Sequence, residues 1–132
     1  MNKKYNLKKI LFVLAVILLS VRSNAQTLFV KTIDLTIGLK DKDKVEWQEP
    51  TAQSILIKID NKVMVIYSAN VQTFRIITFD GEGENGVKSW YCSDDKGLNC
   101  YFYMSTADPK TGVISIGLEY DDLAYYYRGR QE

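Results

Sequence analysis

Beyond residue 26, apolar and polar side chains alternate along the chain in short runs, and no stretch keeps apolar residues at helical spacing. Gly, Asp, Asn and Pro separate these runs, as they separate strands that are joined by turns. In the longest run, residues 27–39, apolar residues hold alternate positions: Phe29, Ile33, Leu35, Ile37 and Leu39. The alternation predicts an all-β protein with about eight antiparallel strands in up-and-down order.

The strongest turn signal is Asp60-Asn61, which lies between the apolar runs 54–59 and 62–67. A two-residue turn there would pair Ile57 with Met64 on one face and Leu56 with Val65 on the other. Both faces of this hairpin are apolar, and a flat open sheet would leave one of them in water. We therefore expect a small barrel, or else a strongly curled sheet or sandwich. A homodimer across the apolar face is the alternative.

Two cysteines are expected to face each other across a second hairpin. With Asp95-Lys96-Gly97 as a three-residue turn, Cys92 lies opposite Cys100, and facing Cβ atoms are about 4.5–5.5 Å apart. A redox-active pair usually has Cys-x-x-Cys spacing at the start of a helix, which is missing here. The sequence therefore predicts a structural disulfide between Cys92 and Cys100, provided that the protein reaches an oxidising compartment.

The first 25 residues have the three parts of a secretory signal peptide. Four lysines precede an unbroken apolar run, Ile10–Leu19, and small residues follow it at Ser23 and Ala25. The apolar run is half the length of about 20 residues that a membrane span requires. We expect cleavage after Ala25 and export to the periplasm or the medium. Residues 26–132 would then form a single all-β domain that does not insert into a membrane.

Charge and composition exclude several classes of function. The chain has no His, so catalysis or metal binding by imidazole is excluded. Residues 26–132 carry 12 basic and 16 acidic residues, a net charge of −4, which argues against a nucleic-acid partner. No catalytic motif, phosphate-binding loop or cluster of metal ligands is present, and the sequence predicts neither an enzyme nor a cofactor.

Two groups of carboxylates are candidate sites. Asp34, Glu46, Glu49 and Glu119 could supply an acid and a base, but their spacing selects no pair, and solvated strand faces account for all four. The loop Asp80–Gly86 begins like a calcium loop but lacks the Gly and Glu that an EF-hand needs at its sixth and twelfth positions. A flexible acidic loop is the simpler interpretation.

The aromatic residues carry the main functional hypothesis. Residues 26–132 hold 14 of them, and the hairpin register places Tyr91, Tyr101 and Tyr103 on the face opposite to Trp90 and Phe102. Tyr126 is expected to point outward as well, because Tyr125 and Tyr127 would pair with the apolar Leu118 and Ile116 across the turn Asp121-Asp122. Tyrosines are also common on half-exposed strands that bind nothing.

We therefore expect an exported, non-catalytic binding module that uses Tyr91, Tyr101, Tyr103 and Tyr126, or the mouth of the barrel. Its partner would be a saccharide, a small apolar ligand or an envelope or extracellular protein. The alternative is an interaction or inhibitor module that acts through the apolar face of the 54–67 hairpin. A small carboxylate-dependent hydrolase has the least support.

The order of these features along the chain is also informative: Trp47, the turn Asp60-Asn61, Trp90-Tyr91-Cys92, then Gly97 with Cys100. This order resembles that of small exported all-β bacterial proteins of uncharacterised function. The resemblance implies an all-β fold and no particular activity.

Overall fold

The computed structural model describes residues 27–132, so the expected signal peptide lies outside the described residues. Ten strands make up the fold: β1 Leu28–Asp41, β2 Lys44–Trp47, β3 Thr51–Ala52, β4 Leu56–Ile59, β5 Val63–Tyr67, β6 Gln72–Glu82, β7 Lys88–Asp94, β8 Asn99–Met104, β9 Val113–Glu119 and β10 Leu123–Gln131. Within residues 27–132, no helix is long and apolar enough to cross a bilayer.

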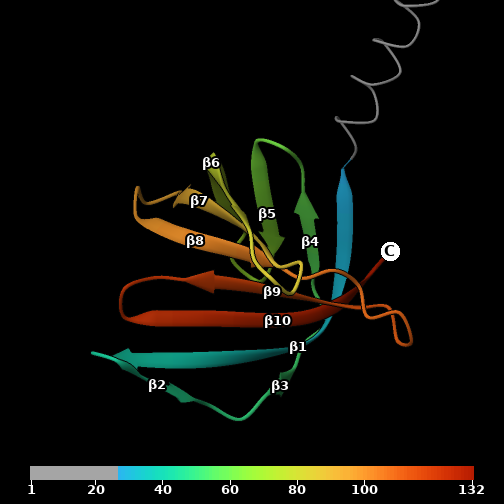
Figure 1. The fold of residues 1–132 in the computed structure, drawn as a ribbon, viewed down its shortest axis with the longest axis horizontal. Coiled ribbons are helices and arrows are strands. Elements are labelled where there is room, and N and C mark those ends of the chain that lie inside the picture. The colour runs from blue at the N-terminus through green and yellow to red at the C-terminus, as the bar shows by residue number, and fades with distance from the viewer. Residues whose placement is uncertain (1–26) are drawn as a thin grey trace, which may run out of the picture.

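Eight of the strands form a closed antiparallel barrel, which confirms the predicted fold class. Strands β4 to β10 follow one another as a meander, and β1 pairs with β4 on one side and with β10 on the other (Figure 1). The short strands β2 and β3 add to the edge of β1 outside the barrel. Closure satisfies the main-chain groups that an open sheet would leave at its two edges.

A β-bulge in β1 makes this double pairing possible. Residues 28–31 pair with β4, the register with β10 shifts between Thr32 and Asp34, and the strand then turns to run beside β10 (Figure 1). The extra residue, Ile33, switches the side of the sheet on which the following side chains lie. The prediction that Phe29 lies on the same face of the strand as Leu35 and Ile37 is therefore wrong. Before the bulge, Val30 and Thr32 are buried and Phe29 is exposed.

Polar side chains hold the bulge in place. The Thr32 hydroxyl donates to the Gln53 carbonyl at 2.7 Å and accepts from the Ile55 amide at 2.9 Å, so it ties the chain before β4 to β1. Beside it, Arg128 of β10 faces Asp34 of β1 and donates from both Nε and Nη2 to the two carboxylate oxygens. This bidentate ion pair joins the first and last strands of the barrel.

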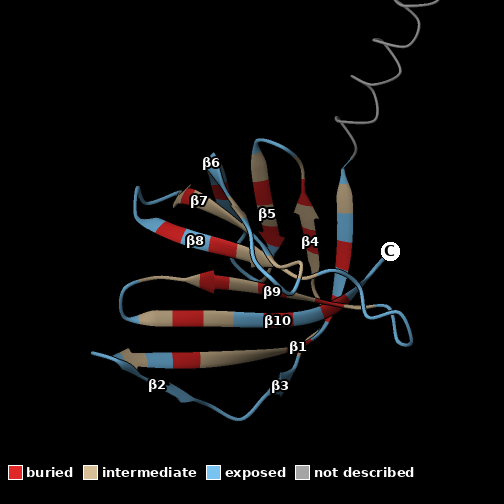
Figure 2. Ribbon diagram, viewed as in Figure 1, coloured by how far each residue is buried: buried red, intermediate tan, exposed pale blue. Residues whose placement is uncertain are grey.

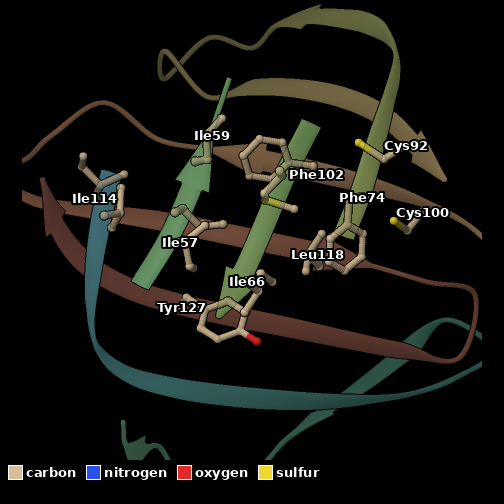
Figure 3. Packing of buried hydrophobic residues seen from close by; sticks show 13 residues of the cluster. Ile57, Ile59, Ile66, Phe74, Cys92, Cys100, Phe102, Ile114, Leu118 and Tyr127 are labelled. Atoms are coloured by element: carbon tan, nitrogen blue, oxygen red, sulfur yellow. The ribbon is translucent and has the colours of Figure 1, made fainter. Parts of the chain in front are cut away.

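Inward-facing side chains from all eight barrel strands form one core (Figures 2 and 3). Ile57, Met64, Ile66, Phe102 and Ile116 are fully buried in it. Two predicted hairpin registers are confirmed: Cys92 lies opposite Cys100 across β7 and β8, and Leu118 lies opposite Tyr125 across β9 and β10. Gly97 has the positive φ of 82° that its turn requires.

The predicted register of the β4–β5 hairpin is wrong by two residues. Ile57 faces Ile66 and Ile59 faces Met64, because the turn is centred on Asn61-Lys62, one residue later than the sequence suggested, and the Asp60 amide donates to the Val63 carbonyl at 3.0 Å. The Asp60 carboxylate accepts from the amides of Lys62 and Val63, both at 2.8 Å, and so holds the turn in this position. A shift of two residues leaves every side chain on its expected face, so the core is unaffected.

The predicted disulfide is also wrong, since Cys92 and Cys100 are buried free thiols. Facing side chains stand side by side on a sheet, and a disulfide forms only if both sulfurs turn toward each other. Cys92 Sγ instead lies 4.0 Å from the carbonyl oxygen of Trp90 in its own strand. Burial raises the pKa of Cys92 to about 12 and that of Cys100 to about 11.

Alkylation should detect these thiols. Because the thiolate is the reactive form, we expect iodoacetamide at pH 8 to label neither cysteine in the folded protein and both in guanidinium without reductant. Mass spectrometry of the intact chain counts the added groups. An unlabelled denatured protein that gains two labels after reduction would contradict the free thiols.

The Asp34–Arg128 pair should make stability depend on acid pH. The hydrogen bonds from Arg128 hold the pKa of Asp34 below its usual value. The stabilisation is therefore complete above the pKa of the unfolded chain, about 3.9, and is lost as pH falls through the lower folded pKa. In urea titrations, Asp34→Asn should be less stable than the wild type at pH 6, and the difference should shrink at pH 2. An equal difference at both pH values would show that the ion pair contributes nothing.

Candidate functional site

The tyrosines selected from the sequence lie on the outer wall of the barrel, over strands β7 to β10. Tyr91 faces Tyr101 with ring centroids 5.3 Å apart, and Tyr101 stacks on Tyr103 at 6.3 Å. Tyr126 also points outward and is 38% exposed. The structure therefore brings the first three together and places Tyr126 two strands away from Tyr103.

Gly117 of β9 lies between the three clustered tyrosines and Tyr126. In the sheet register it lies opposite both Tyr103 of β8 and Tyr126 of β10. Neighbouring strands are about 4.8 Å apart, so the two tyrosine backbones stand about 10 Å apart with no side chain between them. The result is a hollow of about 290 Å³, lined mostly by apolar atoms, which we call the Gly117 slot.

Trp47 and Tyr126 together form one wall of the slot. The indole of Trp47 lies across Gly38 of β1 and meets Tyr126 edge-on, with centroids 6.4 Å apart. A Cβ on Gly38 would lie 2.8 Å from the indole, so only glycine leaves room for the ring in this position. The indole is 54% exposed, whereas Ala124, which faces Gly38 on the outer wall, is 8% exposed.

Polar groups lie at both ends of the slot. At one end, the Tyr126 hydroxyl donates to Ser115 Oγ at 2.8 Å, which leaves the serine proton free to donate. At the other end, Glu119 accepts from Lys40 at 2.6 Å. Burial, and next the negative charge of Glu119, raise the pKa of Tyr103, so its phenol stays neutral. The slot thus combines aromatic walls with hydroxyl and carboxylate groups at its ends.

The four carboxylates that could have supplied an acid–base pair do not come together. Asp34 is engaged by Arg128 and Glu119 by Lys40, whereas Glu46 and Glu49 are exposed near β2. Asp80 and Glu82 of the predicted acidic loop belong to β6. Across residues 27–132, no three Cys, Asp or Glu side chains are grouped so that they could hold a metal ion.

The mouth of the barrel was the other site predicted for a ligand. One end has a hollow of about 400 Å³ with Val71, Phe74, Leu98 and Tyr125 among its lining residues. Here the Tyr120 hydroxyl donates to Asp94 at 3.0 Å. This mouth is lined by more polar residues than the Gly117 slot, among them Asn70, Gln72, Asp95, Lys96 and Asp122.

No family model matches the chain, and no curated protein or solved structure is significantly similar to it. The resemblance drawn from the sequence is therefore supported only in its coarsest part, the all-β barrel, and no family is identified.

Two residues of the slot, Trp47 and Gly117, were not selected from the sequence as site residues. Trp47 is in a short strand that pairs with β1 only, and nothing local shows which other strands its ring will reach. Gly117 did carry a signal, because it interrupts the strand Val113–Glu119 at an outward-facing position. Glycine weakens a strand interior and often marks the close approach of another group.

Substituting alanine for each of the two glycines of this surface should change the stability of the protein in opposite directions. Gly38→Ala would force the indole and Val45 aside, since the added Cβ would lie 2.9 Å from Val45 Cγ1, and we expect a loss of about 1–2 kcal/mol in unfolding free energy. Gly117→Ala would place its Cβ 3.7 Å from Tyr103, an ordinary contact, and should gain about 0.5 kcal/mol.

Urea denaturation measures both changes, and near-ultraviolet circular dichroism follows the environment of Trp47. If Gly38→Ala left both the stability and the tryptophan signal unchanged, the indole would not occupy the position described.

Proposed function

We propose that this protein is an exported, non-catalytic binding protein that holds one ring of a saccharide in the Gly117 slot. The proposal rests on the presence of glycine, which has no side chain, at position 117 of an otherwise regular strand. The backbone of Gly117 is ordinary extended strand and the position has room for a larger side chain, so neither backbone conformation nor packing requires glycine there.

The width of the slot supports a flat ligand. A ring held between two aromatic side chains needs about 3.5–4.0 Å to each wall, or about 7–8 Å between the walls. The backbones of Tyr103 and Tyr126 stand about 10 Å apart, and the hollow between them has a volume of about 290 Å³.

The polar groups favour a sugar ring over a purely apolar ring. A sugar ring has an apolar face that stacks on aromatic side chains and an edge of hydroxyl groups. Ser115 can donate to such an edge, and the Glu119 carboxylate can accept from it. A binding site with such groups at its ends would discriminate against ligands that leave them unpaired.

Export rests on the first 25 residues of the sequence, and within the proposal it places the protein where envelope or extracellular glycans are present. The alternative of a protein-interaction module has less support. The inner face of the 54–67 hairpin belongs to the barrel core. On its outer face the charged Lys58 lies beside the apolar Leu56 and Val65, so that face is not a continuous apolar surface.

The test fills the slot without disturbing the fold. Gly117→Val should leave the barrel as stable as the wild type or slightly more stable, because valine favours strands. It should nevertheless abolish any binding found for the wild type in a glycan array and in thermal-shift measurements with soluble oligosaccharides. Indole serves in the same assay as a ring without hydroxyl groups.

Ser93→Val is the matched control. Ser93 also points outward from the barrel wall, opposite Asn99, and does not line the slot, so this variant should bind like the wild type. Binding that survives in Gly117→Val, or a wild type that binds indole and no oligosaccharide, would overturn the proposal.

A further inference from the structure

A second surface of the barrel, separate from the slot, carries a row of positive charges. In the closed sheet, Arg130 of β10 lies directly opposite Lys31 of β1, which is diagonal to Lys58 of β4. Val65 of β5 faces Lys58 and is in turn diagonal to Arg75 of β6. The four cations Arg130, Lys31, Lys58 and Arg75 therefore follow one diagonal across five neighbouring strands, and we call them the cationic stripe.

The spacing of the stripe follows from sheet geometry. Directly facing side chains are about 5 Å apart and diagonal ones about 7–8 Å, so the stripe is about 25 Å long and its charges are on average about 8 Å apart. It crosses the wall formed by β10, β1, β4, β5 and β6, whereas the slot lies over β8 to β10 and reaches β10 at Tyr126, four residues before Arg130.

The charges of the stripe are not neutralised by ion pairs. The two ion pairs formed among residues 27–132 are Lys40–Glu119 and Arg128–Asp34, and neither includes a residue of the stripe. Asp60, in the turn beyond Lys58, forms no ion pair with it but interacts with its charge at longer range, and Glu132 lies at the edge beside Phe29. Arg130 uses its Nε to bind the Thr111 carbonyl and keeps its charge.

The facing pair Lys31 and Arg130 is notable because like charges in direct register destabilise a sheet. Residues 26–132 have a net charge of −4, so four cations without intervening carboxylates depart from the average surface. A bound polyanion would remove the repulsion between Lys31 and Arg130 and stabilise the complex.

Aromatic and apolar side chains flank the cations. Phe29 is 39% exposed and Tyr67 43% exposed, and they lie on opposite sides of the stripe, with the half-buried Leu56 between Lys31 and Tyr67. Such residues provide flat contact area for sugar rings next to charges that attract carboxylates. The barrel wall is convex, so a linear polymer can follow the stripe, whereas a flat bilayer would reach only part of it.

We propose that the cationic stripe binds a linear polysaccharide that carries carboxylates on its sugar rings. This proposal uses different residues from the Gly117 slot and does not depend on it.

Affinity electrophoresis through gels that contain polygalacturonate tests the proposal. The wild type should be retarded at low salt, released at about 0.3 M NaCl, and unaffected by neutral dextran. Lys31→Gln with Lys58→Gln should weaken binding about tenfold and reduce the salt dependence by about half, because two of four cations are lost.

Lys42→Gln with Lys44→Gln is the matched control, because it removes two cations at the far end of β1 without touching the stripe. It should retain wild-type retardation, and so should Gly117→Val. Circular dichroism confirms that each variant is folded.

Equal losses in the two double variants would show that net charge alone matters and would overturn the proposal. It would also be overturned by absence of retardation, or by tighter binding to a 20-nucleotide single-stranded DNA or to phosphatidylglycerol vesicles than to the polysaccharide.

Discussion

The fold depends on one strand that serves both edges of the sheet. The first residues of β1 complete the meander beside β4, and the remainder, after the bulge at Ile33, pairs with β10. Without that bulge, the strand could not change direction and remain paired on both sides. The Asp34–Arg128 pair and the Thr32 hydroxyl stabilise this junction, so the polar residues of β1 contribute directly to closure.

Closure also creates both candidate sites. The Gly117 slot needs Trp47, which is brought to Tyr126 only because β1 lies between β2 and β10. The cationic stripe needs Arg130 beside Lys31, a pairing between the last and first strands of the barrel. In an open meander with the same hairpins, each surface would lose at least one of its residues.

As proposed, the two surfaces would bind different parts of a carbohydrate. The slot is mostly apolar and polar only at its ends, which is the reason for proposing a single ring there. The stripe is long, charged and convex, which fits a chain of rings. Neither surface presents a pair of carboxylates or a metal site among the described residues, and the recognition chemistry proposed for both is stacking, hydrogen bonding and charge.

Local patterning in the sequence determined the eight barrel strands in outline, two hairpin registers and the outward position of Tyr91, Tyr101, Tyr103 and Tyr126, because each depends on neighbours a few residues apart. It did not predict the short β3 or the extension of β6 to Glu82. The predicted register of β4 and β5 was wrong, since the turn is centred one residue later, on Asn61-Lys62. The predicted disulfide was wrong because facing positions do not set the direction of the sulfurs. Only the tertiary structure decided the face of Phe29, the position of Trp47 and the meeting of Lys31 with Arg130. These depend on the bulge and on pairing between residues about 100 positions apart, which a period of two along the chain does not encode.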